Sequence, residues 1–186
     1  PYTLFAQAVE AHNAKDYDRC IGLLDEAIRK DPDFAEAYNN RGIAKDYKGD
    51  YDGAIADYTK AIELNPRDAK AYYNRGLAWY RKGDYDRAIA DFDRATELNP
   101  KLAAAYYNRG AAKENKGDYD GAIADCTKAI ELNPRFAMAY GGRGNAKRKK
   151  GDLDGAIADY TKAIELDPGL WQAWGNLAVA YAQKRD

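Results

Sequence analysis

Residues 71–100 read AYYNRGLAWYRKGDYDRAIADFDRATELNP, and this stretch decides the fold. It contains two helical patterns separated by a Lys-Gly-Asp turn. Each pattern places apolar and small residues on one side at the i, i+4, i+7 spacing of an amphipathic helix. These residues are Tyr72, Gly76 and Trp79 in the first pattern and Ala88, Phe92 and Ala95 in the second.

The residues between and after the two patterns favour helix ends. Lys82 suits the negative end of a helix dipole, Gly83 can adopt a positive φ, and Asp84 can accept hydrogen bonds from the free N–H groups of the next helix. Pro100 disfavours helical geometry at the residue before it. One such helical hairpin cannot bury both of its apolar stripes, so it needs a neighbour on each side.

The rest of the chain supplies those neighbours, because the same pattern recurs every 34 residues. Prolines, glycines, aspartates and alanines all keep this step. The prolines are Pro32, Pro66, Pro100, Pro134 and Pro168, and the turn glycines are Gly49, Gly83, Gly117 and Gly151. A helix–turn–helix unit of this length is typical of tetratricopeptide repeats.

The residue types within each unit also resemble the tetratricopeptide family. Its motif has an aromatic, a small residue, Ala, an aromatic, Ala and Pro where this chain has Tyr38, Gly42, Ala54, Tyr58, Ala61 and Pro66. The resemblance covers the whole chain. It implies an all-α, right-handed superhelical solenoid, in which the first helix of each repeat lines the concave side.

The repeat divides the chain into five units and a terminal helix, as one array without an internal domain boundary. The units are 1–34, 35–68, 69–102, 103–136 and 137–170, followed by a helix in 171–186. We interpret the last helix as a cap on repeat five, with a truncated sixth repeat as the alternative. Repeat five carries Gly141 and Gly142, so we expect its first helix to be the weakest and most mobile.

One feature departs from the family pattern. Where the family usually has a Leu-like residue before the small Gly, four repeats have an arginine, and the same four have an aspartate in the second helix. The pairs are Arg41 with Asp57, Arg75 with Asp91, Arg109 with Asp125 and Arg143 with Asp159, whereas repeat one has Gln7 and Leu23. A charge beside the core needs a partner. We therefore predict an ion pair within each repeat, with ligand binding by the arginines as the alternative.

The composition disfavours several classes of function. The net charge of −1 argues against a nucleic-acid binder, and no apolar run is long enough for membrane insertion. The chain has no serine and only one histidine, His12, so it offers no serine nucleophile and no zinc ligand set. The DYDG segments lack the Glu that a calcium loop requires. We expect neither an enzyme nor a cofactor.

The two cysteines, Cys20 and Cys126, occupy core positions three repeats apart. That separation is too great for a disulfide. We expect buried free thiols, which favour a reducing compartment such as the cytoplasm. Because the sequence begins at Pro1 inside a helical pattern, we expect a fragment or processed form from which a targeting segment is missing.

The first helices carry the candidate binding residues, on the side that does not face the core. Asparagines repeat there among tyrosines and basic residues, which suits an extended peptide more than a buried small molecule. An asparagine ladder can hold a ligand's main chain because an amide both donates and accepts. The predicted groove residues are Asn40, Tyr47, Lys70, Tyr73, Asn74, Tyr80, Arg81, Tyr107, Asn108, Arg148 and Lys149.

The sequence therefore predicts a non-catalytic protein–protein interaction scaffold that binds a protein or peptide ligand in its groove. Arg81, Arg148 and Lys149 indicate a preference for an acidic stretch. The family's clamp for chaperone tails is matched only at Asn40 and Lys70, since the other places hold Phe5, Val9 and Asn74. The main alternative is a self-assembling module that forms a homo-oligomer through its terminal helices, using Leu177 and Tyr181 or the face of repeat one. A nucleic-acid-binding helical array is a further alternative, which the balanced charge disfavours.

Overall fold

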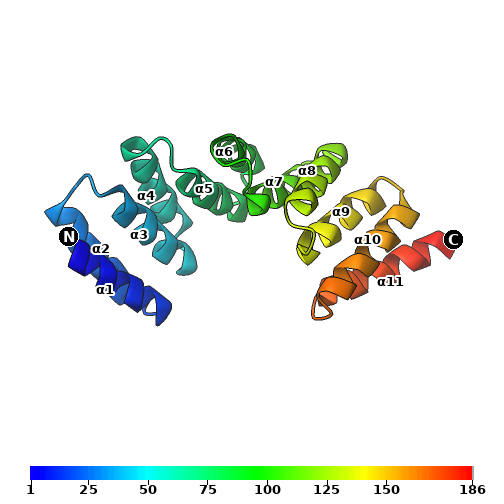
Figure 1. Cartoon of the computed structure of the whole chain (residues 1–186), viewed down its shortest axis with the longest axis horizontal. Coiled ribbons are helices and arrows are strands. Elements are labelled where there is room, and N and C mark those ends of the chain that lie inside the picture. The colour runs from blue at the N-terminus through cyan, green and yellow to red at the C-terminus, as the bar shows by residue number, and fades with distance from the viewer. Residues whose placement is uncertain (186) are drawn as a thin grey trace. The chain divides into compact units, whose positions relative to one another are not determined.

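The computed structural model describes residues 1–185, and over this range it consists of α-helices without strands. The helices alternate along the chain as the repeat predicts (Figure 1). They are α1 Tyr2–Asn13, α2 Tyr17–Lys30, α3 Ala35–Tyr47, α4 Tyr51–Leu64, α5 Ala69–Arg81, α6 Tyr85–Leu98, α7 Ala103–Asn115, α8 Tyr119–Leu132, α9 Ala137–Lys149, α10 Leu153–Leu166 and α11 Trp171–Arg185. The predicted all-α class is confirmed.

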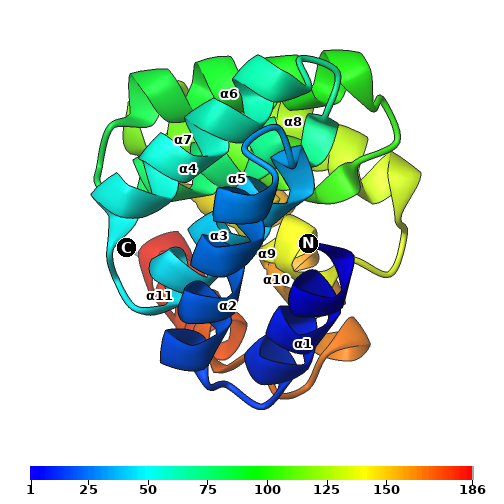
Figure 2. The ribbon, with the colours of Figure 1, turned by 90° about the vertical axis from the view of Figure 1, so that its left-hand side faces the viewer.

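The helices group into two compact units, residues 1–98 with α1–α6 and residues 99–186 with α7–α11. Within each unit the first helix of a repeat packs on its own second helix, and that second helix packs on the next first helix. Figure 2 faces the start of the first unit, where α1 and α2 lie side by side. A single uninterrupted array stays a prediction, and each unit is described by itself.

The turns between paired helices follow the Lys-Gly-Asp chemistry. Gly49 has a φ of 82° and Gly83 a φ of 80°, in the region that side chains disfavour. The next residue caps the following helix: the Asp50 carboxylate accepts a hydrogen bond from the Gly53 N–H at 2.9 Å. Repeat one has Lys15 at the glycine position, and it adopts the same left-handed conformation with a φ of 61°.

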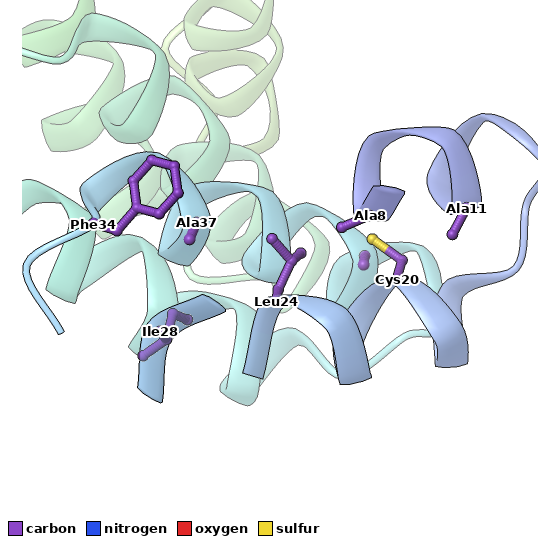
Figure 3. Packing of buried hydrophobic residues seen from close by; sticks show 8 residues of the cluster. Ala8, Ala11, Cys20, Leu24, Ile28, Phe34 and Ala37 are labelled. Atoms are coloured by element: carbon purple, nitrogen blue, oxygen red, sulfur yellow. The ribbon is translucent and has the colours of Figure 1, made fainter. Parts of the chain in front are cut away.

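Except in repeat four, the core of each repeat places a large side chain against a small one. In the first unit, a Cβ atom on Gly42 would lie 2.7 Å from the Tyr58 ring, and one on Gly76 would lie 2.8 Å from the Phe92 ring. The glycines therefore let the two helices of a hairpin approach closely. In repeat one, Leu24 and Cys20 of α2 are buried beneath Ala8 of α1 (Figure 3).

The predicted arginine–aspartate pairs form in all four repeats that carry them. Arg41 donates from Nε to Asp57 at 2.8 Å and from Nη2 at 2.5 Å, and both distances are 2.8 Å for Arg75 and Asp91. The other two pairs have the same bidentate geometry, with Nε distances of 2.9 Å in Arg109–Asp125 and Arg143–Asp159. The aspartates are buried. The structural interpretation of these arginines is confirmed.

Each arginine also has contacts outside its pair. Arg41 donates to Asp25 of α2 at 2.7 Å, and Arg75 donates to Thr59 of α4 at 3.0 Å. One guanidinium thus joins a first helix, its own second helix and the preceding second helix. The hydrogen bond to Asp91 raises the pKa of Arg75 above its ordinary value.

A second series of ion pairs, which the sequence analysis did not identify, joins neighbouring repeats at the turns. Lysines of three Lys-Gly-Asp turns, and Lys184 at the equivalent position of α11, pair with an aspartate that is the second residue of the preceding second helix. Within the two units these pairs are Lys48–Asp18, Lys82–Asp52, Lys150–Asp120 and Lys184–Asp154. They are exposed, so each is worth at most about 1 kcal/mol.

Both cysteines are buried free thiols, as predicted. Burial raises the pKa of the Cys126 thiol to about 12. The thiolate is the reactive form, so this sulfur is inert near neutral pH.

We expect Asp91→Ala to lower the free energy of unfolding by about 3 kcal/mol, because it leaves the Arg75 charge beside the core without its carboxylate. In other repeats a first-helix lysine also contacts the aspartate, as Lys45 contacts Asp57 at 2.8 Å. Repeat three has Trp79 at the position of this lysine, so Asp91 is the informative choice. Urea unfolding followed by circular dichroism measures the change.

The matched control is the double variant Arg75→Gln/Asp91→Leu, which reproduces the Gln7 and Leu23 of repeat one. It should recover most of the lost stability because no charge remains unpaired. Equal destabilisation by the single and double variants would show that the pair contributes through packing rather than charge.

Candidate functional site

The candidate residues lie on first helices that contact one another within each unit. In the first unit α1 contacts α3 and α3 contacts α5, and in the second α7 contacts α9 and α9 contacts α11. We call their predicted binding side the first-helix face. In the first unit it comprises Asn40 and Tyr47 of α3 and Lys70, Tyr73, Asn74, Tyr80 and Arg81 of α5. In the second it comprises Tyr107 and Asn108 of α7 and Arg148 and Lys149 of α9.

The asparagines of this face are half-buried and held by local hydrogen bonds. Asn40 Nδ2 donates to the Glu36 carbonyl at 2.8 Å, and Asn108 Nδ2 donates to the Ala104 carbonyl at 2.9 Å, each one turn back in its own helix. Asn74 Nδ2 instead donates to Asn39 Oδ1 of α3 at 3.1 Å. These bonds fix the direction of each amide. A single hydrogen bond does not use the full hydrogen-bonding capacity of an amide, which has two N–H donors and an acceptor.

The tyrosines of the face each have a ring packed against another aromatic ring. Tyr47 is 63% exposed and stacks on Tyr17, with centroids 5.2 Å apart and planes 7° from parallel. Tyr73 contacts Phe92 at 6.0 Å, Tyr80 contacts Tyr85 at 5.4 Å, and Tyr107 contacts Phe136 at 5.2 Å. The rings are thereby positioned before any ligand arrives, which lowers the entropy lost on binding.

Two of the three basic residues expected to attract an acidic ligand already have carboxylate partners. Arg81 pairs with Asp46 of the preceding first helix, and the Lys149 ammonium lies 3.1 Å from Glu114 in the same relation. Both cations are therefore largely neutralised within their own unit. The sequence analysis did not identify Asp46 and Glu114 as the partners of these cations, although the sequence has the opposite charges 35 residues apart.

The remaining two basic residues of the face differ from each other. Lys70 is exposed at the start of α5. Arg148 is half-buried, and its Nε has no hydrogen-bond partner among the described residues. Burial raises the pKa of Tyr160, and a hydrogen bond from Arg148 opposes that shift. The Tyr160 hydroxyl in turn donates to Asn145 Oδ1 at 2.8 Å.

The two extra glycines of α9 have different surroundings. A Cβ atom on Gly142 would lie 3.2 Å from the Tyr107 ring and 3.3 Å from the Cys126 sulfur, whereas one on Gly141 would meet only Leu170, at 3.8 Å. Cys126 occupies the place that Tyr58 and Tyr160 take in other repeats, so Tyr107 packs where a core aromatic is missing. Gly142 therefore serves packing, and the mobility of α9 stays a prediction.

The face offers amides, phenols and a guanidinium, which are groups that bind by hydrogen bonding and stacking. Within residues 1–185 no cluster of three or more histidine, cysteine, aspartate or glutamate side chains could hold a metal ion. None of the described helices combines the length and the apolar character needed to cross a membrane.

Comparison with protein-family models identifies the repeats. Models described as tetratricopeptide repeat match residues 23–56, 41–103 and 103–136, and one described as TPR repeat matches residues 144–184. The chain belongs to the tetratricopeptide repeat family. Proteins of this family are generally non-catalytic scaffolds for protein interactions. No curated protein matches the sequence.

Solved structures agree with this assignment. A crystal structure of MamA is 30% identical, with a TM-score of 0.81 over 87% of this chain and 94% of that one. YrrB, described as a TPR protein with an unusual peptide-binding site, is 23% identical with a TM-score of 0.78, covering 92% and 89% of the two chains. The first TPR of Spaghetti (RPAP3), bound to the HSP90 peptide SRMEEVD, is 26% identical with a TM-score of 0.62, covering 63% and 94%.

The two glycines of α9 yield a paired prediction. Gly141→Ala should raise the free energy of unfolding by about 0.5–1 kcal/mol, because alanine is the better helix former and its methyl group fits. Gly142→Ala should gain less or lose stability, because its methyl group presses on Tyr107. Thermal unfolding of the two variants side by side measures the difference, and equal gains would show that Tyr107 does not depend on Gly142.

Proposed function

We propose that this protein binds an extended segment of another protein along the first-helix face. The observation that carries the proposal is the recurrence of an oriented asparagine at one position of successive first helices, Asn40 and Asn74 in the first unit and Asn108 in the second. An amide can pair with a peptide unit whatever side chain that unit bears. The ligand is therefore extended and only loosely selected by sequence.

The tyrosines supply the apolar part of the binding. A phenol ring combines a large contact area with only two side-chain torsions, so it is an effective contact residue. Tyr47 and Tyr73 flank the asparagine positions of the first unit, and their rings already pack against Tyr17 and Phe92. A ligand with aromatic or aliphatic side chains beside its bound main chain fits this face.

Charge contributes less to the proposed peptide binding than the sequence indicated. Arg81 and Lys149 already have carboxylate partners, so an acidic ligand would have to displace Asp46 or Glu114. Binding should therefore depend only weakly on salt, because few unpaired charges attract the ligand.

The similar structures support peptide binding by this chain, but they do not support binding of the same ligand. The Spaghetti TPR domain holds a chaperone-derived peptide with an acidic end, and YrrB has a peptide-binding site. This chain has Phe5 and Val9 at two of the polar positions of the chaperone-tail clamp. We therefore favour an internal, extended segment over a terminal carboxylate.

The test measures peptide binding with and without two amides. Peptides selected from a random library on the immobilised chain are titrated by calorimetry against the native chain and Asn40→Ala/Asn74→Ala. Each amide contact contributes about 0.5–1.5 kcal/mol, so the double variant should bind about 5- to 150-fold more weakly. The matched control is Lys60→Ala/Glu63→Ala, two residues of α4 that pair with each other outside the face. Unchanged affinity in the asparagine variant, or a loss only in the control, would refute the proposal.

A second candidate function, self-association through the chain ends, has one specific observation in its favour. The exposed aromatic residues of α11 give the C-terminal end an apolar surface.

A further inference from the structure

The position that holds Tyr73 on α5 and Tyr107 on α7 is occupied by Gly141 on α9. It lies one residue before the asparagine position of the first-helix face, which on α9 holds Gly142. At Gly141 the face therefore lacks the phenol that α5 and α7 carry. A Cβ atom on Gly141 would meet only the Leu170 side chain, at the ordinary contact distance of 3.8 Å. The protein leaves room here for a side chain that it does not supply.

Two other repeats show which kind of side chain fits this room. In repeat one, Phe5 stands at the same position and packs on Phe34, with ring centroids 5.1 Å apart. In repeat four, Tyr107 packs on Phe136 with ring centroids 5.2 Å apart. Both partners directly precede the next first helix, and in repeat five Leu170 has that place. Repeat five thus keeps the apolar partner but lacks the ring that packs on it.

An exposed methionine stands beside this position. Met138 is the one methionine of the chain, lies one helical turn before Gly141, and is 47% exposed. Residues three and four apart are neighbours on a helix surface, so Met138 borders the same part of the face. Among the residues of α7–α10 it is the one exposed large apolar side chain. A flexible thioether adapts to an apolar ligand and makes favourable contacts with aromatic rings.

The packing of the protein explains Gly142 but not Gly141. A glycine inside a helix is less stable than an alanine. At Gly142 this cost has a structural reason, because a Cβ atom would lie 3.2 Å from the Tyr107 ring. Within residues 1–185 no comparable contact requires a glycine at position 141. A ligand side chain that needs the room gives Gly141 a role.

We propose that Met138, Gly141 and Leu170 form a site for an aromatic side chain of the bound peptide. The ring lies over Gly141 and packs on Leu170, as the Tyr107 ring packs on Phe136 one repeat earlier. The site is continuous with the first-helix face, to which position 141 belongs. The inference rests on the proposed function, and it adds a selection for Phe, Tyr or Trp at one position of the ligand.

The probes for the test are peptides selected from a random library on the immobilised native chain. They should share an aromatic residue, and its replacement by alanine should weaken binding about 10- to 100-fold. Gly141→Tyr supplies the ring from the protein itself, so the same peptides should bind this variant about 10- to 100-fold more weakly. On Gly141→Tyr the aromatic residue of the peptide should then contribute little, which a double-mutant cycle measures.

The matched control is Gly141→Ala, whose methyl group leaves most of the room for the ring. It should bind the peptides within about threefold of the native chain. Thermal unfolding followed by circular dichroism checks the fold of both variants. If Gly141→Tyr is unfolded, Met138→Ala replaces it and should weaken binding of the aromatic peptides about 3- to 10-fold.

A photochemical cross-link locates the ring on the unchanged protein. A selected peptide carries benzoylphenylalanine at its aromatic position, and irradiation should attach it to Met138, because excited benzophenone reacts with nearby C–H bonds and favours methionine. Digestion and mass spectrometry identify the attached residue. The chain has a single methionine, so attachment at this side chain is unambiguous.

Four outcomes would overturn the inference alone. They are selected peptides without an aromatic residue, full affinity for folded Gly141→Tyr, equal losses in Gly141→Ala and Gly141→Tyr, and attachment of the probe away from Met138 and Leu170. In each case the proposed function still stands if Asn40→Ala/Asn74→Ala weakens binding. A library that yields no binding peptide would overturn both.

Discussion

The bidentate pair between a first-helix arginine and a second-helix aspartate is the interaction on which the repeats depend. It lies beside the core, where Asp57 and Asp91 are buried, so each charge is tolerable only because the other is in place. The guanidinium then reaches the preceding second helix, at Asp25 or Thr59. A single side chain thus fixes the hairpin and its stacking on the previous repeat.

The same use of charge extends over the surface of each unit. Turn lysines such as Lys48 pair with the previous repeat, and Arg81 pairs with Asp46 between adjacent first helices. Most basic side chains are consequently committed to the structure. What the first-helix face presents is mainly amides and phenols, although 32% of the residues of the chain are charged.

The helical fold and the arginine pairs could be predicted because repetition provides an internal comparison. Repeat one lacks both Arg and Asp, having Gln7 and Leu23, and this joint loss revealed the contact before any coordinates. The partners of Arg81 and Lys149 were missed because they lie on a neighbouring first helix, and the contact depends on the rotation between repeats. The contact between Gly142 and the Tyr107 ring could not be predicted, since only the structure places that ring against the glycine.

Repeat four shows how the packing changes when the aromatic that covers a first helix is lost. That aromatic is replaced by Cys126, and the Tyr107 ring and the Cys126 sulfur both lie beside Gly142. A gap in the core is thus closed by a neighbouring side chain, and the missing side chain of Gly142 leaves the room for it. A substitution at Gly142 therefore acts on the packing of repeat four as well as on its own helix.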